Sequence, residues 1–196
     1  LNGSKMKYQG SYCALITPFK DDIFDEKSFI KIIQWHIKQG TKGIVPCGTT
    51  GESPTLSHDE HKKVVELAVE TSDGRLQVIA GTGSNSTKEA VSLTKHAKQC
   101  GADSALVVVP YYNKPSQEGL KKHFLKIADT VDLPIFIYNI PGRSVVDMSN
   151  ETIEKLSEHE NIIGIKDASN DLSRPAHLKK YITHKKFYQL SGEDAT

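Results

Sequence analysis

Seven short runs of mostly apolar residues recur along the chain and alternate with longer amphipathic segments. The runs are rich in Val and Ile and nearly continuous in apolarity, which is typical of parallel strands covered on both faces. We therefore expect seven buried parallel strands. They cover residues 12–19, 43–48, 77–83, 104–110, 134–140, 162–168 and 187–192.

The segments between these runs have the apolar spacing of amphipathic helices. In residues 26–39 the apolar stripe is Phe29, Ile30, Ile33 and Ile37, and in residues 58–70 it is His61, Val64, Val65 and Ala68. Further helices are predicted at residues 117–129, 150–159 and 173–181.

Residues typical of helix ends support these boundaries. Ser57 with Glu60, and Ser86 with Glu89, have the spacing of capping boxes, in which each side chain satisfies an amide of the first turn. Gly40 and Gly101 stand where the C-caps of two helices are expected.

Alternating strands and helices predict a parallel α/β fold, for which a doubly wound sheet and a (β/α)8 TIM barrel compete. Residues with chemical character follow many successive strands rather than one switch point, which favours the barrel. A complete barrel needs about 250 residues, whereas the chain has 196 and reaches only the seventh strand. We expect residues 6–196 to be a partial TIM-barrel catalytic domain without its last repeat, and residues 1–5, before Met6, to be a tag remnant.

Composition and charge narrow the function classes. Hydrophobic residues make up 37% and charged residues 25%, with a formal net charge of +1. This charge is too small to attract nucleic acid or an anionic membrane, and the longest apolar stretch, residues 105–109, is too short to span a bilayer. Three scattered cysteines, Cys13, Cys47 and Cys100, together with the lack of a signal peptide, indicate reduced thiols and a cytoplasmic protein.

Lys166 lies inside an apolar strand, in IIGIKDA at residues 162–168. With a period of two it shares a face with Ile162 and Gly164, and Gly164 would leave room for a substrate. If this face points into the barrel, burial lowers the pKa of the amine. An ordinary lysine is neutral about once in 2,500 at pH 7, and a drop of about three pKa units, worth about 4 kcal/mol, permits attack on a ketone. For this strand alone, a lysine whose amine reaches solvent is the commoner case.

Two further candidate residues, Tyr138 and Arg143, lie in PIFIYNIPGR at residues 134–143. Tyr138 lies on the strand that directly precedes the strand of Lys166, and a phenol near an imine can transfer protons. Arg143, in the Pro-Gly turn after the strand, can bind a carboxylate through two parallel hydrogen bonds. Taken alone, a core tyrosine and a solvated arginine are the simpler interpretation.

Several other motifs are weaker. GTTGES at residues 48–53 predicts a tight anion-binding turn, but it lacks the lysine of a nucleotide-binding loop. GTGSNS at residues 81–86 is interpreted as an ordinary loop with a helix cap. His58 and His61 lack a third metal ligand, so we expect a solvated helix start and no metal. Tyr111 and Tyr112 are adjacent loop aromatics, which often pack at interfaces.

Together these motifs resemble one family. GTTGES, PYYNKP at residues 110–115, YNIPGR at 138–143 and IKDAS at 165–169 have the order and spacing of dihydrodipicolinate synthases, and the resemblance covers residues 10–194. It implies that Lys166 forms an imine with pyruvate and that the resulting enamine attacks L-aspartate 4-semialdehyde, as a lyase of lysine biosynthesis. No metal or organic cofactor is implied, because the lysine itself activates the ketone.

The resemblance also implies roles for single residues. Tyr138 is expected to carry protons in a relay with Thr49 and Tyr112. Thr50 is expected to hold the carboxylate of pyruvate and Arg143 the carboxylate of the semialdehyde, and Gly192 is expected to bind substrate.

Assembly and regulation are implied as well. Tyr112 is expected to reach the site of a neighbouring subunit, so a homodimer is the smallest competent unit and a homotetramer built from two dimers is expected. Lysine-inhibited members bind L-lysine at the dimer interface. The corresponding positions here are Ser53, His58, His61, Asn85, Glu89 and Tyr111, which implies feedback inhibition by L-lysine.

Three other functions compete with this one. N-acetylneuraminate lyase and related pyruvate-dependent aldolases share the lysine and tyrosine chemistry, but differ around the second substrate. A non-catalytic binding module is conceivable because a chain without its last strand leaves sheet edges uncovered, and we expect the 196-residue chain alone to be inactive. A phosphate- or nucleotide-binding module has only the glycines of GTTGES in its favour.

Overall fold

The computed structural model describes residues 8–193, which divide into two compact units, residues 8–79 and residues 80–193. The predicted tag remnant at residues 1–5 lies outside the described residues. Each of the seven apolar runs contains one strand of a parallel sheet, and within each unit these strands pair in parallel. The predicted parallel α/β class is therefore confirmed in both units.

The first unit places its strands in chain order. Strand β1 (Tyr12–Ala14) pairs with β4 (Gly43–Val45), which pairs with the start of β5 (Gln77–Gly81). Helix α1 (Glu26–Gln39) lies between β1 and β4 in the chain. The short 3-10 helix η1 (Ser53–Thr55) and helix α2 (His58–Ser72) lie between β4 and β5.

Strands β2 (Phe19–Lys20) and β3 (Ile23–Phe24) form an antiparallel hairpin that the apolar pattern did not predict. The predicted strand 12–19 is thus three residues long and is followed by an extended segment that leads into this hairpin. Asp21 and Asp22 form its turn, both with positive φ (53° and 61°). Two successive left-handed residues give a turn whose twist matches that of paired strands, and Asp tolerates this region better than most side chains do.

The helices begin and end largely where their cap residues predicted. Ser57 and Glu60 form the complete capping box of α2, and the side chain of Ser86 accepts a hydrogen bond from the amide of Glu89 at the start of α3 (Thr87–Cys100). Gly40 and Gly101 are the left-handed C-caps of α1 and α3, with φ of 73° and 90°. A Cβ atom makes such φ values costly, which explains glycine at both positions.

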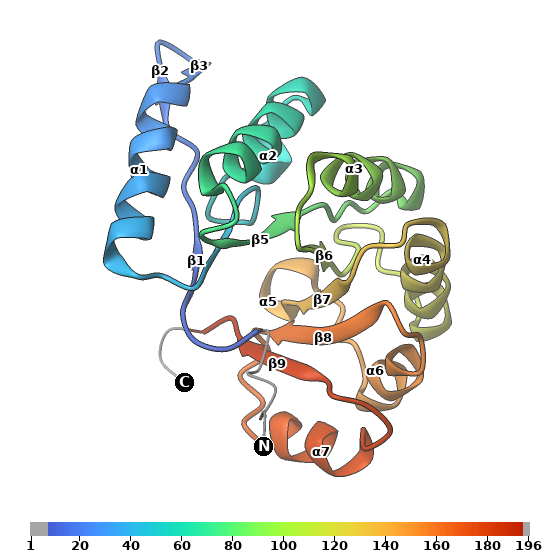
Figure 1. The fold of residues 1–196 in the computed structure, drawn as a ribbon. Helices are drawn as coiled ribbons and strands as arrows, with labels where there is room; N and C mark the ends of the chain where they lie inside the picture. The colour runs from blue at the N-terminus through green and yellow to red at the C-terminus, as the bar shows by residue number, and fades with distance from the viewer. Residues whose placement is uncertain (1–7, 194–196) are drawn as a thin grey trace, which may run out of the picture. The chain divides into compact units, whose positions relative to one another are not determined.

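The second unit contains β6 (Ser104–Val108), β7 (Ile135–Asn139), β8 (Ile162–Asp167) and β9 (Tyr188–Ser191), paired in chain order. Figure 1 shows α3, α4 (Gln117–Thr130), α6 (Asn150–Ser157) and α7 (Arg174–Tyr181) along one side of these strands. A doubly wound sheet would reverse its strand order and carry helices on both faces. This unit instead has the repeat of a (β/α)8 barrel.

Large apolar side chains form the core of the second unit. Phe124, Phe136, Ile135 and Ile137 have no exposed surface. Burying a side chain of this size contributes about 1.5–3 kcal/mol relative to leaving it exposed. Strand β7 is buried along its whole length, so its position is fixed from both faces.

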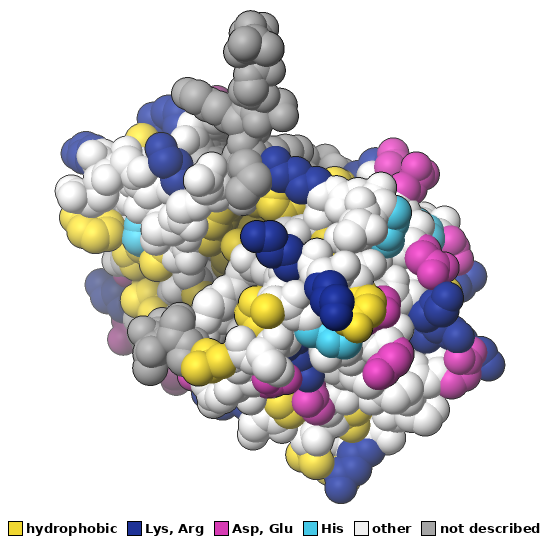
Figure 2. Space-filling view, turned by 90° about the horizontal axis from the view of Figure 1, so that it is seen from below, with side chains coloured by type: hydrophobic (Ala, Val, Ile, Leu, Met, Phe, Trp, Pro, Cys, Tyr) yellow, Lys and Arg dark blue, Asp and Glu magenta, His cyan; other side chains and the backbone are white. Residues whose placement is uncertain are grey.

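The distribution of charged side chains on the surface agrees with the small net charge. Figure 2 shows basic and acidic side chains interspersed over one face of the molecule. Across residues 8–193, every helix is too short or too polar to pass through a membrane.

His123 on α4 is a histidine buried in this core, with 5% of its surface exposed. Its Nδ1 lies 2.8 Å from the hydroxyl of Thr87, and its ring stands edge-on to Phe124. Among the described residues, Nε2 has no hydrogen-bond partner. Burial lowers the pKa of His123 from 6.5 to about 4, because the imidazolium would lose its hydration.

We expect His123 to make the fold acid-sensitive. In the unfolded chain it takes up a proton as the pH falls below its ordinary pKa, whereas in the folded chain it stays neutral until about pH 4. Stability is therefore lost as the pH falls through this window, by about 2–3 kcal/mol between pH 7 and pH 4.5. Urea titrations at both pH values should show this loss shrinking in His123→Leu but persisting in His58→Asn, which alters an exposed histidine. An equal loss in His123→Leu would contradict the assignment.

Candidate active site

Lys166 and Tyr138 lie side by side on adjacent strands. They are directly paired in the parallel register of β7 and β8, and the amine of Lys166 lies 4.5 Å from the centroid of the Tyr138 ring. Tyr138 is 6% exposed and Lys166 is half-buried. The second unit thus brings together an amine and a phenol at the carboxyl ends of two strands, where parallel α/β folds place their sites.

Gly164 does not leave room for a substrate, contrary to the expectation from the sequence. It pairs with Phe136, and a Cβ atom at position 164 would lie 2.7 Å from the Phe136 ring and closer still to the carbonyl oxygen of Tyr188. The glycine is therefore needed for close packing of β7, β8 and β9. The space beside it is occupied by the aromatic ring.

Gly192 lies next to the lysine side chain, directly after β9. A Cβ atom here would lie 3.2 Å from Cε of Lys166 and 2.9 Å from Cβ of Ala168. Its backbone amide donates to the carbonyl of Asp167 at 2.8 Å. The missing side chain thus leaves room for the lysine methylenes, which is compatible with the substrate contact predicted for Gly192.

The GTTGES turn belongs to the first unit and has a tightly held backbone. The amide of Gly51 donates to the carbonyl of Gly48 at 3.1 Å, and the hydroxyl of Thr17 donates to the carbonyl of Gly51 at 2.7 Å. Thr49 and Thr50 are both exposed. Their assigned contacts with the phenol and with pyruvate stay predictions.

The loop after β6 presents the two predicted tyrosines. Tyr112 is 89% exposed and has a φ of 72°, and Lys114 has a φ of 47°. The side-chain amide of Asn85 donates to the carbonyl of Tyr111 at 3.3 Å, and Asn113 donates back to the carbonyl of Asn85 at 3.2 Å. This loop is therefore fixed at its base, while Tyr112 projects away from it.

The other residues assigned to lysine binding are divided between the two units. In the second unit the carboxylate of Glu89 accepts a hydrogen bond from the hydroxyl of Ser84. In the first unit Ser53 is half-buried, His58 is exposed and His61 is 4% exposed. His61 thus belongs to the buried face of α2, as its place in the apolar stripe predicted, and the expectation of a solvated position is wrong for His61 but right for His58.

Arg143 lies exposed in the short helix α5 (Pro141–Ser144), directly after β7. Ser144 is buried, and its hydroxyl donates to the carbonyl of Ile140 at 2.9 Å. Val145 follows with a φ of 67° and is 63% exposed. A positive φ is unusual for a β-branched residue, so this loop is strained where it presents the arginine.

Left-handed residues other than glycine recur in the loops that follow strands. Besides Val145 they include Cys47 after β4, Tyr112 and Lys114 after β6, and Asn170 after β8. Such conformations persist only where surrounding contacts impose them, and they cluster at functional sites. Their positions agree with a site at the carboxyl ends of the strands.

A buried arginine behind these loops was missed from the sequence. Arg174, the first residue of α7, is 5% exposed. Its guanidinium donates to both carboxylate oxygens of Asp147 at 3.1 Å and to Asp167 at 3.0 Å. Burial opposes the charge, but the hydrogen bonds and attraction of the two carboxylates outweigh this effect and raise the pKa of Arg174.

Asn139, at the end of β7, completes this group. It has no exposed surface, and its amide donates to Asp147 at 2.7 Å and to Asp167 at 2.9 Å. Asn139 and Asp167 belong to YNIPGR and IKDAS, so the motifs contained them without indicating a role. Nothing in the local sequence pattern distinguishes Asp147 or Arg174 from solvated charges.

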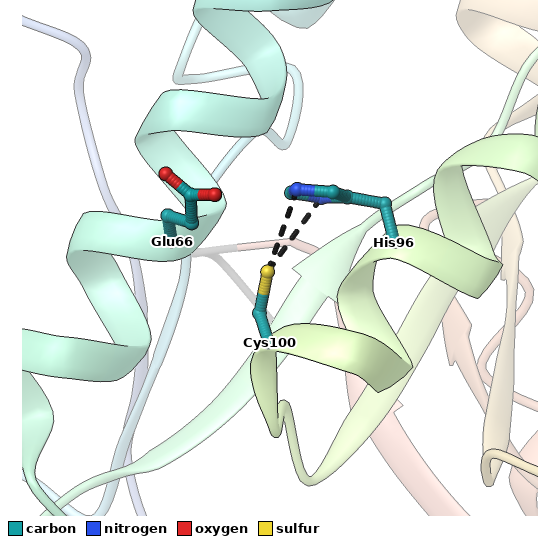
Figure 3. Close-up of side chains that lie close together, drawn as sticks. All are labelled: Glu66, His96 and Cys100. Atoms are coloured by element: carbon teal, nitrogen blue, oxygen red, sulfur yellow. Dashed lines mark hydrogen bonds between the residues drawn. The ribbon is translucent and has the colours of Figure 1, made fainter.

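Within residues 8–193, Cys13, Cys47 and Cys100 form no disulfide. Burial raises the pKa of Cys47 to about 12, which keeps its thiol protonated. Cys100 lies one helical turn from His96 on α3, with its sulfur 3.5 Å from Nε2 (Figure 3).

The sequence is similar to known enzymes along nearly its whole length. The sequence model of the Dihydrodipicolinate synthetase family matches residues 7–196. A 4-hydroxy-tetrahydrodipicolinate synthase from Rhodospirillum centenum is 60% identical over 189 residues, covering 96% of this chain and 65% of the relative. The chain thus spans about 65% of the length of the curated relatives it matches.

Solved structures show the same similarity in three dimensions. The chloride-inhibited dihydrodipicolinate synthase from Acinetobacter baumannii, complexed with pyruvate, is 50% identical with a TM-score of 0.88, covering 92% of this chain and 63% of that one. The enzyme from Cyanidioschyzon merolae with lysine bound is 41% identical with a TM-score of 0.90, covering 94% and 63%. The predicted family and its TIM-barrel fold class are confirmed.

We expect a side chain at position 192 to crowd Lys166 and Ala168 and so to destabilise the fold. Gly192→Ala places a methyl group 2.9 Å from Ala168, which cannot rotate away, and 3.2 Å from Lys166. In the longest natural polypeptide that contains this sequence, the free energy of unfolding should fall by about 1–3 kcal/mol, as measured by denaturant titration. Gly142→Ala is the control, because its Cβ atom meets nothing within 4 Å. Equal stability of the two variants would contradict the crowding.

Proposed function

Because this chain belongs to the dihydrodipicolinate synthetase family, we propose that it carries the catalytic site of a 4-hydroxy-tetrahydrodipicolinate synthase. The substrates are pyruvate and L-aspartate 4-semialdehyde. The observation that carries this proposal is the pairing of a half-buried amine with a buried phenol, Lys166 with Tyr138, 4.5 Å from amine to ring centroid.

Lys166 acts as the nucleophile. Its neutral amine attacks the ketone of pyruvate, water leaves, and the resulting imine loses a proton from the methyl carbon to give an enamine. The enamine carbon attacks the aldehyde of the semialdehyde and forms the new carbon–carbon bond. The amino group of the second substrate then displaces Lys166 by transimination, which closes the ring and restores the free amine. No metal or organic cofactor takes part.

Tyr138 serves as the proton carrier for these steps. A phenol beside the amine is within reach of the proton that leaves the methyl carbon of the imine and of the proton that the carbinol oxygen takes up before water leaves. Its burial excludes bulk water as a competing proton source. Thr49 and Tyr112 extend the relay, and Thr50 and Gly192 hold the pyruvate end.

Arg143 binds the carboxylate of the second substrate. Its position supports this role, because it is exposed at the start of the loop after the strand of Tyr138. A guanidinium can form two parallel hydrogen bonds with a carboxylate, which orients the aldehyde for attack.

Tyr112 joins subunits in the active assembly, which is a homodimer or a homotetramer built from two dimers. A tyrosine that is 89% exposed and held at a φ of 72° suits contact with a second copy, since aromatic residues are enriched at interfaces. L-lysine inhibits the enzyme at this interface, through Ser53, His58, His61, Asn85, Glu89 and Tyr111.

The lysine and tyrosine chemistry is shared with N-acetylneuraminate lyase and other pyruvate-dependent aldolases. Curated relatives at 58% and 60% identity are 4-hydroxy-tetrahydrodipicolinate synthases, which favours the synthase, as does Arg143 in YNIPGR. Comparing rates with aspartate semialdehyde and with sialic acid separates these enzymes. Inactivity of residues 1–196 by themselves stays a prediction.

We expect borohydride to trap pyruvate on Lys166. With the longest natural polypeptide that contains this sequence, reduction in the presence of pyruvate should add the mass of one reduced pyruvate to the peptide bearing Lys166. Lys166→Met should abolish the adduct and lower kcat by at least about a thousandfold, since covalent activation is lost. Lys179→Met, an exposed lysine of α7, is the control. An adduct on another lysine, or none, would refute the proposed chemistry.

We also expect Glu89 to determine the affinity for L-lysine, because its carboxylate can pair with an ammonium group. Glu89→Gln should raise the lysine concentration for half-inhibition at least about tenfold, a difference of about 1.4 kcal/mol, in steady-state assays. Glu118→Gln, which alters an exposed carboxylate on α4, should leave inhibition unchanged. If millimolar lysine did not slow the unaltered enzyme, the regulatory proposal would be abandoned.

A further inference from the structure

We propose that Arg174 is a positioning residue, which fixes the loop bearing Arg143 relative to the strand bearing Lys166. It does so by bridging Asp147 in that loop and Asp167 at the end of β8. The proposal rests on the proposed function and deepens it: the bridge determines how firmly the carboxylate of the second substrate is held over the enamine.

The bridge depends on the shape of a guanidinium group. One nitrogen of Arg174 donates at 3.1 Å to one oxygen of Asp147, and the other nitrogen donates at 3.1 Å to its second oxygen. The first nitrogen also donates at 3.0 Å to Asp167. A lysine ammonium is a point charge without this fork, so it cannot hold both carboxylates in the same arrangement.

Four separate chain segments meet at this bridge. Asn139 comes from the end of β7, Asp147 from the loop that follows, Asp167 from the end of β8, and Arg174 from the start of α7. Asn139 donates to both carboxylates, and its side-chain oxygen accepts from the amide of Met148 at 3.0 Å. Every heteroatom of the Asn139 amide group is thereby engaged, which is typical of a structural polar network.

Among residues 8–193, the other side-chain hydrogen bonds of this loop stay within it or reach β7 and α4. Ser144 donates to the carbonyls of Ile140 and Val146, and Val145 holds a strained backbone while exposed to solvent. Gln117 on α4 binds the backbone carbonyl of Asp147 at 2.9 Å. Arg174 adds the tie between the Asp147 side chain and β8.

Charge makes the bridge more than a packing contact. Asp147 and Asp167 direct one oxygen each at the same nitrogen of Arg174 and at the amide of Asn139. Without the guanidinium, two carboxylates would face each other across a short gap and would repel. The side chain of Asp147 is 48% exposed and that of Asp167 is 17% exposed, so the loop is the part that would move.

The strand register connects the bridge to the reacting groups. Tyr138 pairs with Lys166, and one residue further Asn139 pairs with Asp167. Successive side chains of a strand point to opposite faces, so the amine and phenol lie on one face while the bridge holds the other. Arg143 lies four residues before Asp147, within the same loop. Displacing that loop therefore moves Arg143 while β7 and β8 keep Lys166 beside Tyr138.

The test compares the two Michaelis constants of the longest natural polypeptide that contains this sequence. In Arg174→Lys, and separately in Asp147→Asn, KM for L-aspartate 4-semialdehyde should rise about tenfold or more, because a small misplacement of a binding group is costly. KM for pyruvate and the borohydride-trapped fraction of Lys166 should stay within twofold. In the double variant, KM for the semialdehyde should rise no further than in the poorer single variant, because both substitutions break the same contact between Arg174 and Asp147.

Glu154→Gln is the matched control, because it alters the contact of Glu154 with His177 between α6 and α7, at 2.7 Å and outside the loop. It should lower stability without changing either KM. A lower melting temperature with unchanged KM for the semialdehyde in both test variants would overturn the proposal, as would an equal rise of both Michaelis constants. If Arg174→Lys does not fold, Asp147→Asn alone decides. Absence of a trapped imine in the unaltered enzyme would instead refute the proposed function.

Discussion

The parallel pairing of β7 with β8 is the interaction on which the rest of the site depends. It places Tyr138 against Lys166 and Asn139 against Asp167. A slip of one residue would turn each of these side chains to the opposite face. The register is held by the full burial of β7 and by the close fit of Gly164 to Phe136 and to the backbone of β9. Packing in the core thus decides which functional groups meet at the strand ends.

The two faces at the ends of β7 and β8 carry different groups. One face carries the amine and the phenol in a half-buried setting. The other carries a polar network in which one guanidinium and one amide satisfy two carboxylates. Buried charges are costly unless they are paired and hydrogen-bonded, so such a network favours one arrangement of its loops over alternatives. The arrangement of Lys166 and Tyr138 is in this way stabilised by the network on the opposite face of the strands.

Backbone strain is concentrated in the loops and is rare in the scaffold. Asp73 at the end of α2 and the two turn residues of the hairpin account for the left-handed side chains outside the loops that follow the parallel strands. Helices α1, α2 and α3 begin with capping side chains, and α1 and α3 end with left-handed glycines. The stability of the regular elements therefore offsets the conformational strain of the loops. These loops present Tyr112 and Arg143 to solvent.

The sequence by itself determined the seven parallel strands and the longer helices with most of their caps, and it indicated Lys166 and Tyr138 as candidates, because apolar periodicity, capping and ordered motifs are local signals. Only the tertiary structure decided that Gly164 accommodates Phe136, and that Arg174 bridges Asp147 and Asp167. Arg174 and Asp147 are 27 residues apart in the chain. The hairpin at residues 19–24 escaped prediction because its two-residue strands are too short to show a period. Contacts of this kind arise from strand register and loop path, which depend on the whole packed core and leave no mark in a short stretch of sequence.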